Sequence, residues 1–394
     1  MTERRIHHSG TEGTEDVHEG RGEARLAPAT GTRCYLGSEG RSPVCPSSVS
    51  SVPLWSILLF AACSDPQDVM NPAGPQAERI ARLGWTLIGV AAVVALLVYA
   101  ALAMAVWRGR RRAARGEPAD VTPAGERQIA RVNATAAAVS LLILLLFVVA
   151  SAATGRAISW PKMKDGRGTT PIGDQAPLTV EVTGHQYWWE MRYVDPSDPS
   201  RSLTTSNELH IPVGRPVRVV LKTRDVIHSF WIPNLHGKQD MVPGHDQQTY
   251  IRADRPGYYR GQCAEFCGHQ HAKMAFDVVA EPAAQFQTWY ENSLMPAAAP
   301  PDSSARRGQR VFLSSSCVMC HAINGTPAGS RVGPELTHLA SRLTIAAGTL
   351  PNTRGHLGGW VMNPQAIKPG SHMPANELSP DELNALLDYL RSLK

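Results

Sequence analysis

The sequence lacks both a strong excess of charge and the cysteine pattern of a disulfide-stapled domain. Its 394 residues hold 39 lysines and arginines against 34 acidic residues, and this net charge of +5 gives no reason to expect nucleic acid as a partner. Seven cysteines are present, and four of them form two close pairs among histidines and methionines: Cys263 with Cys267 and Cys317 with Cys320. Such spacing is typical of metal-binding positions rather than of a disulfide framework.

The first 63 residues hold no segment that we expect to fold. Residues 1–48 are polar and lack apolar periodicity, which predicts disorder or a start codon assigned too far upstream. Residues 49–63 carry a short apolar run that is too short to span a bilayer, which favours a signal peptide. The run precedes Cys63 as a lipoprotein cleavage box would, so we expect a lipidated Cys63, although Phe60 fits that box poorly. An ordinary signal peptide is the alternative.

Charge is absent from two long apolar runs, Leu83–Trp107 and Val132–Gly155. At about 1.5 Å per residue, each run exceeds the roughly 30 Å hydrocarbon core, so we predict two membrane-spanning helices rather than buried helices of a soluble core. The connection over residues 108–131 holds seven arginines, which places it in the cytoplasm by the positive-inside rule. Residues 64–157 are therefore predicted to form a two-pass transmembrane hairpin with both flanks outside.

Residues 158–292 carry the pattern of a β domain. Short apolar runs are separated by prolines and glycines, at Leu178–Thr183, Val217–Leu221, Thr249–Ile251 and Ala275–Val279. This pattern predicts a small antiparallel sandwich or barrel. A stretch rich in proline, alanine and serine over residues 293–304 then predicts a semi-rigid linker between two domains.

Residues 305–394 are predicted to form a helical domain. Ser379 and Glu382 have the spacing of a capping box, with Pro380 at the first helical position. Leucines follow at helical spacing, at positions 383, 386, 387 and 390. The closing helix should therefore pack against an apolar surface, either a haem edge or a plain core.

The segment Gly261–Met274 concentrates two thiols, two imidazoles and a thioether. Thiolate and thioether ligands together select copper, whereas structural zinc sites use cysteine, histidine and carboxylates. A zinc site and a structural disulfide between Cys263 and Cys267 are the alternatives, and the neighbouring ligands argue against both. Spacing alone leaves open which of the nearby histidines bind the metal.

The pattern C-x-E-x-C-G-x-x-H-x-x-M over residues 263–274 resembles the CuA loop of cytochrome c oxidase subunit II, and residues 225–244 resemble that family's second ligand segment. The resemblance implies a cupredoxin-like Greek-key domain with a dinuclear copper centre. It implies two bridging thiolates, two imidazoles, a thioether and one backbone carbonyl as ligands, from Cys263, Cys267, His228, His271, Met274 and Glu265. In this family the glutamate side chain also reaches a magnesium ion at the interface with subunit I; a solvated carboxylate is the alternative for Glu265.

The stretch Gly184–Glu190 resembles the aromatic segment through which electrons from external cytochrome c reach the copper centre in this family. The position that holds a tryptophan in many members is Tyr187 here, a departure from the family's pattern. Trp188 and Trp189 belong to the same segment. An aromatic strand that only covers the sandwich is the alternative.

Cys317, Cys320 and His321 form the C-x-x-C-H sequence of covalent haem c attachment, in which both thiols bond to the haem and the histidine binds iron. The exported, helical context strengthens this interpretation. A thioredoxin-like redox pair is the alternative, but the βαβ setting that such a pair needs is missing.

Met373, in the sequence Ser-His-Met-Pro, resembles the distal iron ligand of class I cytochromes c, and Met362 and His372 are its competitors. The resemblance implies an all-α class I cytochrome c domain. A histidine and methionine ligand pair raises the haem potential, which suits delivery of electrons to copper.

Together these resemblances imply subunit II of a bacterial cytochrome c oxidase with a fused cytochrome domain. We expect cytochrome c or another cytochrome to reduce the haem, and electrons to pass through copper to subunit I, which reduces oxygen to water with proton pumping. The expected partners are subunits I and III and the bacterial inner or plasma membrane, without nucleic acid. The two apolar runs hold no histidine for a haem–copper centre, so we assign no catalytic residue to this chain.

Several other functions share part of this pattern. A quinol oxidase subunit would lack the copper ligands, and a nitrous oxide reductase would need a large propeller domain that this sequence does not contain. The CuA subunit of a nitric oxide reductase and a membrane-tethered redox or copper-carrier protein stay open as alternatives. Co-purification with a many-span haem subunit discriminates an oxidase subunit from a carrier.

Overall fold

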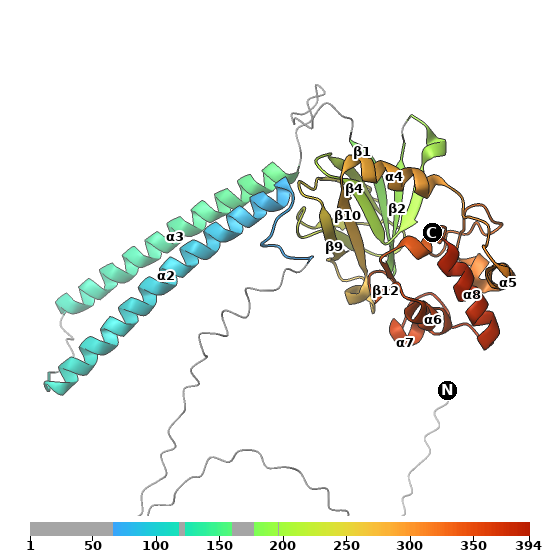
Figure 1. Ribbon diagram of the computed structural model, residues 1–394. Coiled ribbons are helices and arrows are strands. Elements are labelled where there is room, and N and C mark those ends of the chain that lie inside the picture. Colours follow the sequence, from blue (N-terminus) through green and yellow to red (C-terminus); the bar gives the residue numbers. More distant parts are fainter. Residues whose placement is uncertain (1–65, 118–122, 160–176, 196) are drawn as a thin grey trace, which may run out of the picture. The chain divides into compact units, whose positions relative to one another are not determined.

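The computed structural model describes residues 66–117, 123–159, 177–195 and 197–394 (Figure 1). The chain divides into two units, Met1–Cys63 and Ser64–Lys394, and every described residue belongs to the second unit. The expectations of an unfolded N-terminal segment, of a signal peptide and of a lipidated Cys63 therefore lie outside the described residues.

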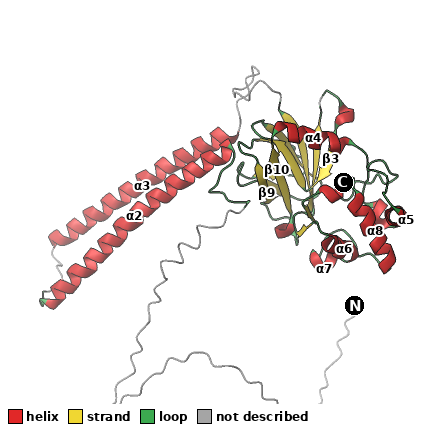
Figure 2. Cartoon of the chain, in the orientation of Figure 1, coloured by secondary structure: helices red, strands yellow, loops and turns green. Residues whose placement is uncertain are grey.

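Two long helices precede the β domain: α2 (Pro75–Ala114) and α3 (Pro123–Ser159). They lie side by side (Figure 2), and Arg79 Nη1 in α2 donates to the carbonyl oxygen of Ala157 in α3 over 2.5 Å, so the start of one helix meets the end of the other. Their apolar side chains are not covered by the described chain, and the side chain of Leu96 is 69% exposed. Such surfaces suit hydrocarbon rather than water. Both predicted spans are confirmed as helices long and apolar enough to cross a membrane.

Helix α2 begins directly against the β domain. The backbone N–H of Ala73 donates to the carbonyl oxygen of Asn234 over 2.7 Å. Gly74 follows as the N-cap, and a Cβ at this position would lie 2.3 Å from the carbonyl oxygen of Arg252. Only glycine allows this close approach of two backbones. The first membrane helix and the β domain are therefore joined without a spacer.

The β domain is a sandwich of two five-stranded sheets (Figure 1). The strand order in the first sheet is β3 (Leu203–Ser206), β2 (Trp188–Val194), β1 (Leu178–His185), β5 (Val217–Thr223) and β8 (Gln247–Ile251). The order in the second sheet is β4 (Glu208–Pro212), β10 (Ala275–Glu281), β9 (Gly257–Cys263), β6 (His228–Trp231) and β7 (Gln239–Met241). The predicted cupredoxin-like fold class is confirmed.

The expectation of a purely antiparallel sandwich is wrong in two places, because β1 pairs with β5 and β4 pairs with β10 in parallel. The chain reaches β5 only after β2, β3 and β4, and this long connection permits a parallel pair. Asn207 stands between β3 and β4 with a φ of 60°, and this left-handed backbone turns the chain from one sheet to the other. Its side-chain oxygen accepts a hydrogen bond from the N–H of Trp189 over 2.8 Å, which fixes the corner.

The core of the sandwich forms between the inward faces of the two sheets. Strands β2 and β5 bury alternate side chains, as expected for strands with one face inward. The same core reaches the end of the second sheet, where it includes Cys263, Cys267 and Met274. The candidate copper ligands are therefore set in a packed, apolar environment.

A helical domain follows the sandwich. Helix α4 (Ala283–Leu294) follows β10 in the chain. The later elements are α5 (Ser303–Ser314), β11 (Thr344–Ile345), β12 (Leu350–Pro351), α6 (Arg354–Met362), α7 (Pro364–Ile367) and α8 (Pro380–Ser392). Short 3₁₀ turns lie at Pro199–Arg201, His271–Lys273, Ser316–Met319 and Leu339–Ser341. The predicted capping box of Ser379 and Glu382 is present at the start of α8.

Helices α5 and α8 cross at close range through Gly308. A Cβ at Gly308 would lie 1.9 Å from the carbonyl oxygen of Ala385, so this crossing requires glycine. Phe312 and Tyr389 meet edge to face in the same interface, with 6.1 Å between ring centroids. The predicted leucine stripe of α8 contributes to this core through Leu383, Leu386, Leu387 and Leu390.

Candidate functional site

The predicted copper ligands meet at one end of the second sheet. His228 begins β6, Cys263 ends β9, and the loop before β10 brings back Cys267, His271 and Met274. The two Sγ atoms lie 3.8 Å apart. Cys263 Sγ lies 3.7 Å from His228 Nδ1, whereas Cys267 Sγ lies 3.7 Å from His271 Nδ1 and 3.8 Å from Met274 Sδ. The two thiols therefore form the centre of the cluster, and each has its own imidazole.

Glu265 turns its backbone, not its side chain, toward the cluster. Its carbonyl oxygen lies 3.2 Å from Cys263 Sγ, where the resemblance implies a carbonyl ligand. Its carboxylate lies 3.4 Å from Lys238 Nζ and is 42% exposed. The two polar groups of this residue thus face different surroundings.

Asp225 orients His228, although the sequence analysis assigned it no role. Its Oδ1 accepts a hydrogen bond from His228 Nε2 over 2.8 Å, and this tautomer leaves Nδ1 free to bind a metal beside Cys263. Burial alone would lower the pKa of His228, but hydrogen bonds to Asp225 and Cys263 raise it. Burial would raise the pKa of Asp225, yet its hydrogen bonds, the one from His228 foremost, lower this pKa to about 2. The carboxylate therefore stays charged and holds the ring.

The two thiols differ strongly in pKa. The hydrogen bond with Cys267 lowers the pKa of Cys263 to about 3, and the same bond together with burial raises the pKa of Cys267. A metal that displaces the remaining proton would take both sulfurs as thiolates. With two imidazoles, a buried thioether and a carbonyl beside them, this donor set fits copper better than zinc.

The three predicted aromatic residues have different surroundings. Trp189 is fully buried in the sandwich, with its ring centroid 6.1 Å from that of His228. Trp188 stacks on His185 with ring centroids 4.2 Å apart. The hydroxyl oxygen of Tyr187 accepts a hydrogen bond from the backbone N–H of His269 over 3.1 Å. This side chain therefore contacts residues 263–274, which we call the copper loop.

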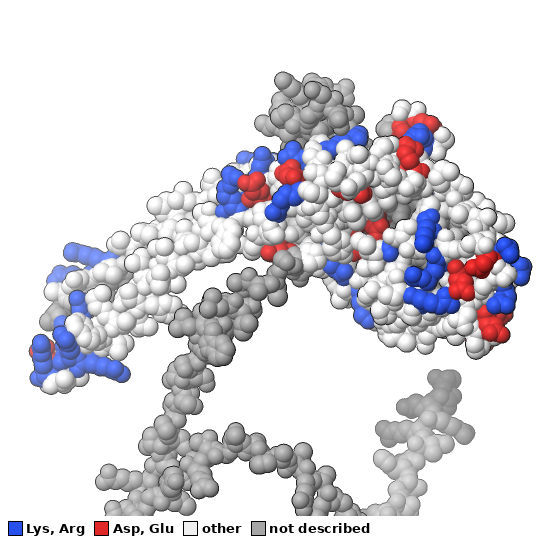
Figure 3. Space-filling view, in the orientation of Figure 1, with Lys and Arg blue, Asp and Glu red and all other residues white. Residues whose placement is uncertain are grey.

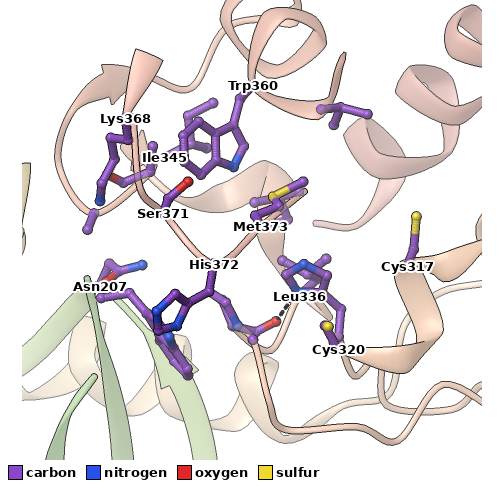
Figure 4. Close-up of a pocket in the computed structure, with 18 of the residues that line it drawn as sticks. Asn207, Cys317, Cys320, Leu336, Ile345, Trp360, Lys368, Ser371, His372 and Met373 are labelled. Atoms are coloured by element: carbon purple, nitrogen blue, oxygen red, sulfur yellow. Dashed lines mark hydrogen bonds between the residues drawn. The ribbon is translucent and has the colours of Figure 1, made fainter. Parts of the chain in front are cut away.

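The predicted haem-attachment residues line a pocket in the helical domain (Figure 4). Cys317 and Cys320 lie in the turn after α5, and His321 follows them. His321 Nδ1 donates to the carbonyl oxygen of Pro334 over 2.7 Å, which leaves Nε2 as the metal-binding nitrogen. Burial lowers the pKa of His321, so the imidazole is neutral and able to bind iron.

Met373 lines the same pocket from the loop before α8 (Figure 4). Its competitor Met362 is not among the lining residues, whereas His372 is. The ring of His372 lies 6.4 Å from that of Tyr187, measured between centroids. The arrangement favours Met373 over Met362 as the second iron ligand.

Arg342 is a buried cation in the pocket wall that the sequence analysis missed. Its Nη2 donates to the carbonyl oxygen of Glu335 over 2.5 Å, whereas its Nε has no hydrogen-bond partner within the described part of the chain. Its Nη2 also lies 3.4 Å from Glu335 Oε2, so the cation is paired within the domain. The unpartnered Nε fits a carboxylate of a bound haem, because buried donors are normally satisfied. No motif around this position indicates such a role.

The β domain completes this pocket. Gln186, Tyr187, Trp188 and Asn207 of the sandwich lie in its wall together with residues of the helical domain. Tyr187 therefore contributes to both candidate sites, since its hydroxyl also touches the copper loop. The two candidate sites therefore share a wall, which is formed by residues far apart in the sequence.

Comparison with known families identifies both domains. Residues 196–281 match the family described as cytochrome c oxidase subunit II, periplasmic domain, and residues 305–394 match the cytochrome c family. These matches imply copper binding in the sandwich and haem binding in the helical domain, in agreement with the donor sets described above.

Relatives of known function match most of the chain. Cytochrome c oxidase subunit 2 of Alkalihalophilus pseudofirmus is 34% identical over 347 residues, which cover 87% of this chain and 96% of the relative. The same subunit of Bacillus subtilis is 30% identical over 349 residues, which cover 86% and 95%. The solved periplasmic domain of subunit II from Bradyrhizobium japonicum matches 30% of this chain and 94% of its own, at 30% identity and a TM-score of 0.28. By its identity with the two full-length relatives, the chain belongs to the cytochrome c oxidase subunit 2 family, and its match over residues 305–394 gives it a cytochrome c domain.

Proposed function

We propose that this chain accepts electrons at a covalently bound haem c and relays them through a dinuclear copper centre to the haem–copper subunit I of a bacterial cytochrome c oxidase. Subunit I would then reduce oxygen to water and pump protons. One observation carries the proposal: two thiols 3.8 Å apart are surrounded by imidazole, thioether and carbonyl donors, next to a C-x-x-C-H pocket in the same chain.

The residues of the copper site favour electron transfer over bond chemistry. Cys263 and Cys267 would hold a dinuclear copper centre as thiolates, together with His228, His271 and Met274, and such a centre would supply one-electron transfer. Asp225 fixes the ring of His228, and the side chains of Cys263, Cys267 and Met274 are buried in the packed core. A rigid, largely buried site keeps the reorganisation energy low, which makes transfer fast.

The proposed route between the two centres passes through Tyr187. This residue lines the haem pocket, and its hydroxyl is bonded to the copper loop at His269, two residues beyond Cys267. Trp188 lines the same pocket wall, and Trp189 lies beside His228 on the copper side. The tyrosine that replaces the family's tryptophan thus serves transfer from the fused haem rather than from an external protein.

The charge distribution supports the proposed topology. Figure 3 shows basic side chains gathered at the end of the helix pair remote from the sandwich, where the arginines of residues 108–115 are exposed. Between their two ends, both helices show almost no charged side chains in this view. We place the basic end in the cytoplasm and the copper and cytochrome domains outside.

Three partners follow from this topology. Subunit I would receive electrons from the copper site, and subunit III would complete the complex. Cytochrome c or another cytochrome would donate electrons to the haem. The exposed carboxylate of Glu265 is the group that we expect to reach a magnesium ion at the contact with subunit I. Oxygen chemistry belongs to subunit I, since α2 and α3 contain no histidine.

Electron paramagnetic resonance of the oxidised, copper-loaded full chain in detergent tests the copper assignment. We expect hyperfine structure from one unpaired electron shared by two copper nuclei, lost in Cys263→Ser and retained in His321→Ala. A spectrum of one isolated copper would contradict the dinuclear site. Purification of the native protein without a many-span haem subunit would instead favour a membrane-tethered redox protein.

A further inference from the structure

The cytochrome domain is fastened to the sandwich through a short segment, Leu343–Gly348, which we call the interdomain strap. Its first residue donates its backbone N–H to Glu208 Oε2 over 2.9 Å. The hydroxyl of Thr344 donates to Asp277 Oδ2 over 2.5 Å. Both acceptors belong to the second sheet of the copper domain, so the strap crosses from one domain onto the other.

The strap continues along the strand that follows the copper loop. The backbone N–H of Ala275, the residue after Met274, donates to the carbonyl oxygen of Ala347 over 3.0 Å. Arg260 Nη2 donates to the carbonyl oxygen of Gly348 over 3.1 Å. The strap therefore reaches the first residue beyond the copper loop.

The two carboxylates under the strap, Glu208 and Asp277, are buried, and their hydrogen bonds are divided between the two domains. Asp277 is 0% exposed, and its Oδ1 accepts a hydrogen bond from the hydroxyl of Tyr258 over 2.5 Å. Glu208 Oε1 is bonded to His210 Nε2 over 2.9 Å. Each carboxylate thus uses one oxygen within the sandwich and the other for the strap. Because buried carboxylates need their hydrogen bonds, this arrangement favours one docked position over a loosely tethered domain.

Lys368 is a buried amine of the same interface. It follows α7 and is 2% exposed. Its Nζ donates to the carbonyl oxygen of Tyr187 over 2.9 Å and to that of Ala346, in the strap, over 3.2 Å. No ion pair joins it to a carboxylate among the described residues, and the charged groups that act on it are Lys273 and Cys267. A buried ammonium held only by carbonyls is costly, so its position calls for a functional explanation.

Lys368 contacts the residue that lies between the two redox sites. Tyr187 is held from both sides, by Lys368 at its carbonyl and by the N–H of His269 at its hydroxyl. A Cβ on Gly268 would lie 2.6 Å from that hydroxyl oxygen, so the copper loop packs tightly on the ring. The position of this ring therefore depends on both contacts.

We propose that Lys368 is a positioning residue for electron transfer, which fixes Tyr187 between the haem pocket and the copper loop and, with the strap, holds the cytochrome domain in one docked position. The inference rests on the proposed function. One electron leaves the reduced haem and reduces the copper centre by one electron, without a bond forming or breaking. Burial lowers the pKa of Lys368 to about 7. Below this pH the lysine is charged, and its positive charge, which acts on Cys267, also favours the reduced copper centre.

The test compares Lys368→Met with Lys273→Met in the full chain in detergent. Lys273 is exposed and donates to the carbonyl oxygen of Ile367, next to Lys368, so its replacement removes an interdomain hydrogen bond without removing a buried amine. After flash reduction of the haem, we expect Lys368→Met to slow haem-to-copper transfer at least tenfold. It should also lower the copper midpoint potential at pH 6, where Lys368 is charged. The Lys273→Met protein should stay within about twofold of the parent rate, because the ammonium of an exposed lysine exchanges such a hydrogen bond for one to water at little cost.

Amide hydrogen exchange on the copper-depleted protein gives a readout that needs no electron transfer. We expect the N–H of Ala275, bonded to the strap, to exchange faster in Lys368→Met than in Lys273→Met. Parent-like transfer, potential and exchange in Lys368→Met would overturn the inference. If the parent chain showed no dinuclear copper signal, the proposed function would fail, and the exchange experiment would still decide whether Lys368 holds the docked position.

Discussion

The copper site and the haem pocket are assembled in opposite ways. Every proposed copper ligand except His228 comes from the single loop over residues 263–274, and neighbouring sulfur and imidazole donors already lie within 3.8 Å of each other. The haem pocket combines a turn after α5, a loop before α8 and a wall from the other domain. A loop at the end of a sheet can define a metal site locally, whereas the pocket depends on two folded domains meeting correctly.

The largest expected effect tests whether the two sites load independently. Cys267→Ala should abolish the dinuclear copper signal and leave the haem absorption spectrum unchanged, because Cys267 belongs to the copper loop alone. Replacing both Cys317 and Cys320 with alanine should remove covalent haem and leave the copper signal. Resonance and absorption spectra of both variants check this expectation, and loss of both cofactors from either variant would contradict local assembly of the copper site.

The next effect concerns the packing that supports the haem pocket. Gly308→Ala would push a Cβ into the backbone of α8 and should destabilise the cytochrome domain by about 3 kcal/mol. Gly355→Ala in α6 is the control, since a Cβ there meets nothing within 4 Å. The control should change stability by less than about 1 kcal/mol. Denaturant unfolding followed by haem absorption measures both, and equal losses would show that the close crossing of α5 and α8 is unimportant.

A smaller effect tests how the sandwich orients its ligands. Asp225→Asn should weaken copper binding by about 10- to 100-fold, because such carboxylates fix the tautomer and orientation of a metal-binding histidine. Asp246→Asn is the control, since Asp246 is 67% exposed and lies 3.8 Å from Lys222. Copper titration against a competing chelator measures the affinities. Unchanged affinity in Asp225→Asn would mean that packing alone positions His228.

The smallest effect is a pH dependence of the stability of the sandwich. Burial alone would lower the pKa of His210, but hydrogen bonds to Glu208 and Glu281 raise it above 6.5. A raised pKa in the folded state adds stability that is fully present below the unfolded value and is lost as pH rises through the folded value. His210→Gln should therefore destabilise the protein more at pH 5.5 than at pH 9. Thermal unfolding at both pH values measures this, and an equal loss at both would contradict a charged His210.

Local patterns predicted the elements of the fold better than their pairing. The uncharged runs and the alternating strands are visible in short windows, and so is the capping box at Ser379. The parallel pairing of β1 with β5 was not, because it joins residues as distant as Val180 and Val219. The domain boundaries stay predictions.

The residues of the candidate sites also differ in how well the sequence predicts them. The copper loop and the C-x-x-C-H sequence are contiguous, so their chemistry was apparent before folding. Asp225, Arg342 and Lys368 are single polar residues whose roles depend on what surrounds them after folding. No residue pattern distinguishes them from solvated side chains.

The direct junction at Gly74 sets a height above the membrane. Only eight residues, 75–82, lie between this junction and the uncharged run that begins at Leu83, and at about 1.5 Å per helical residue they span roughly 12 Å. A small folded domain is about 30 Å across, so none fits along this axis between the copper domain and the hydrocarbon. Lipid headgroups and the outer surface of an integral membrane protein do fit. If electrons leave the proposed copper site toward the bilayer, this gap has room only for an acceptor embedded in the membrane.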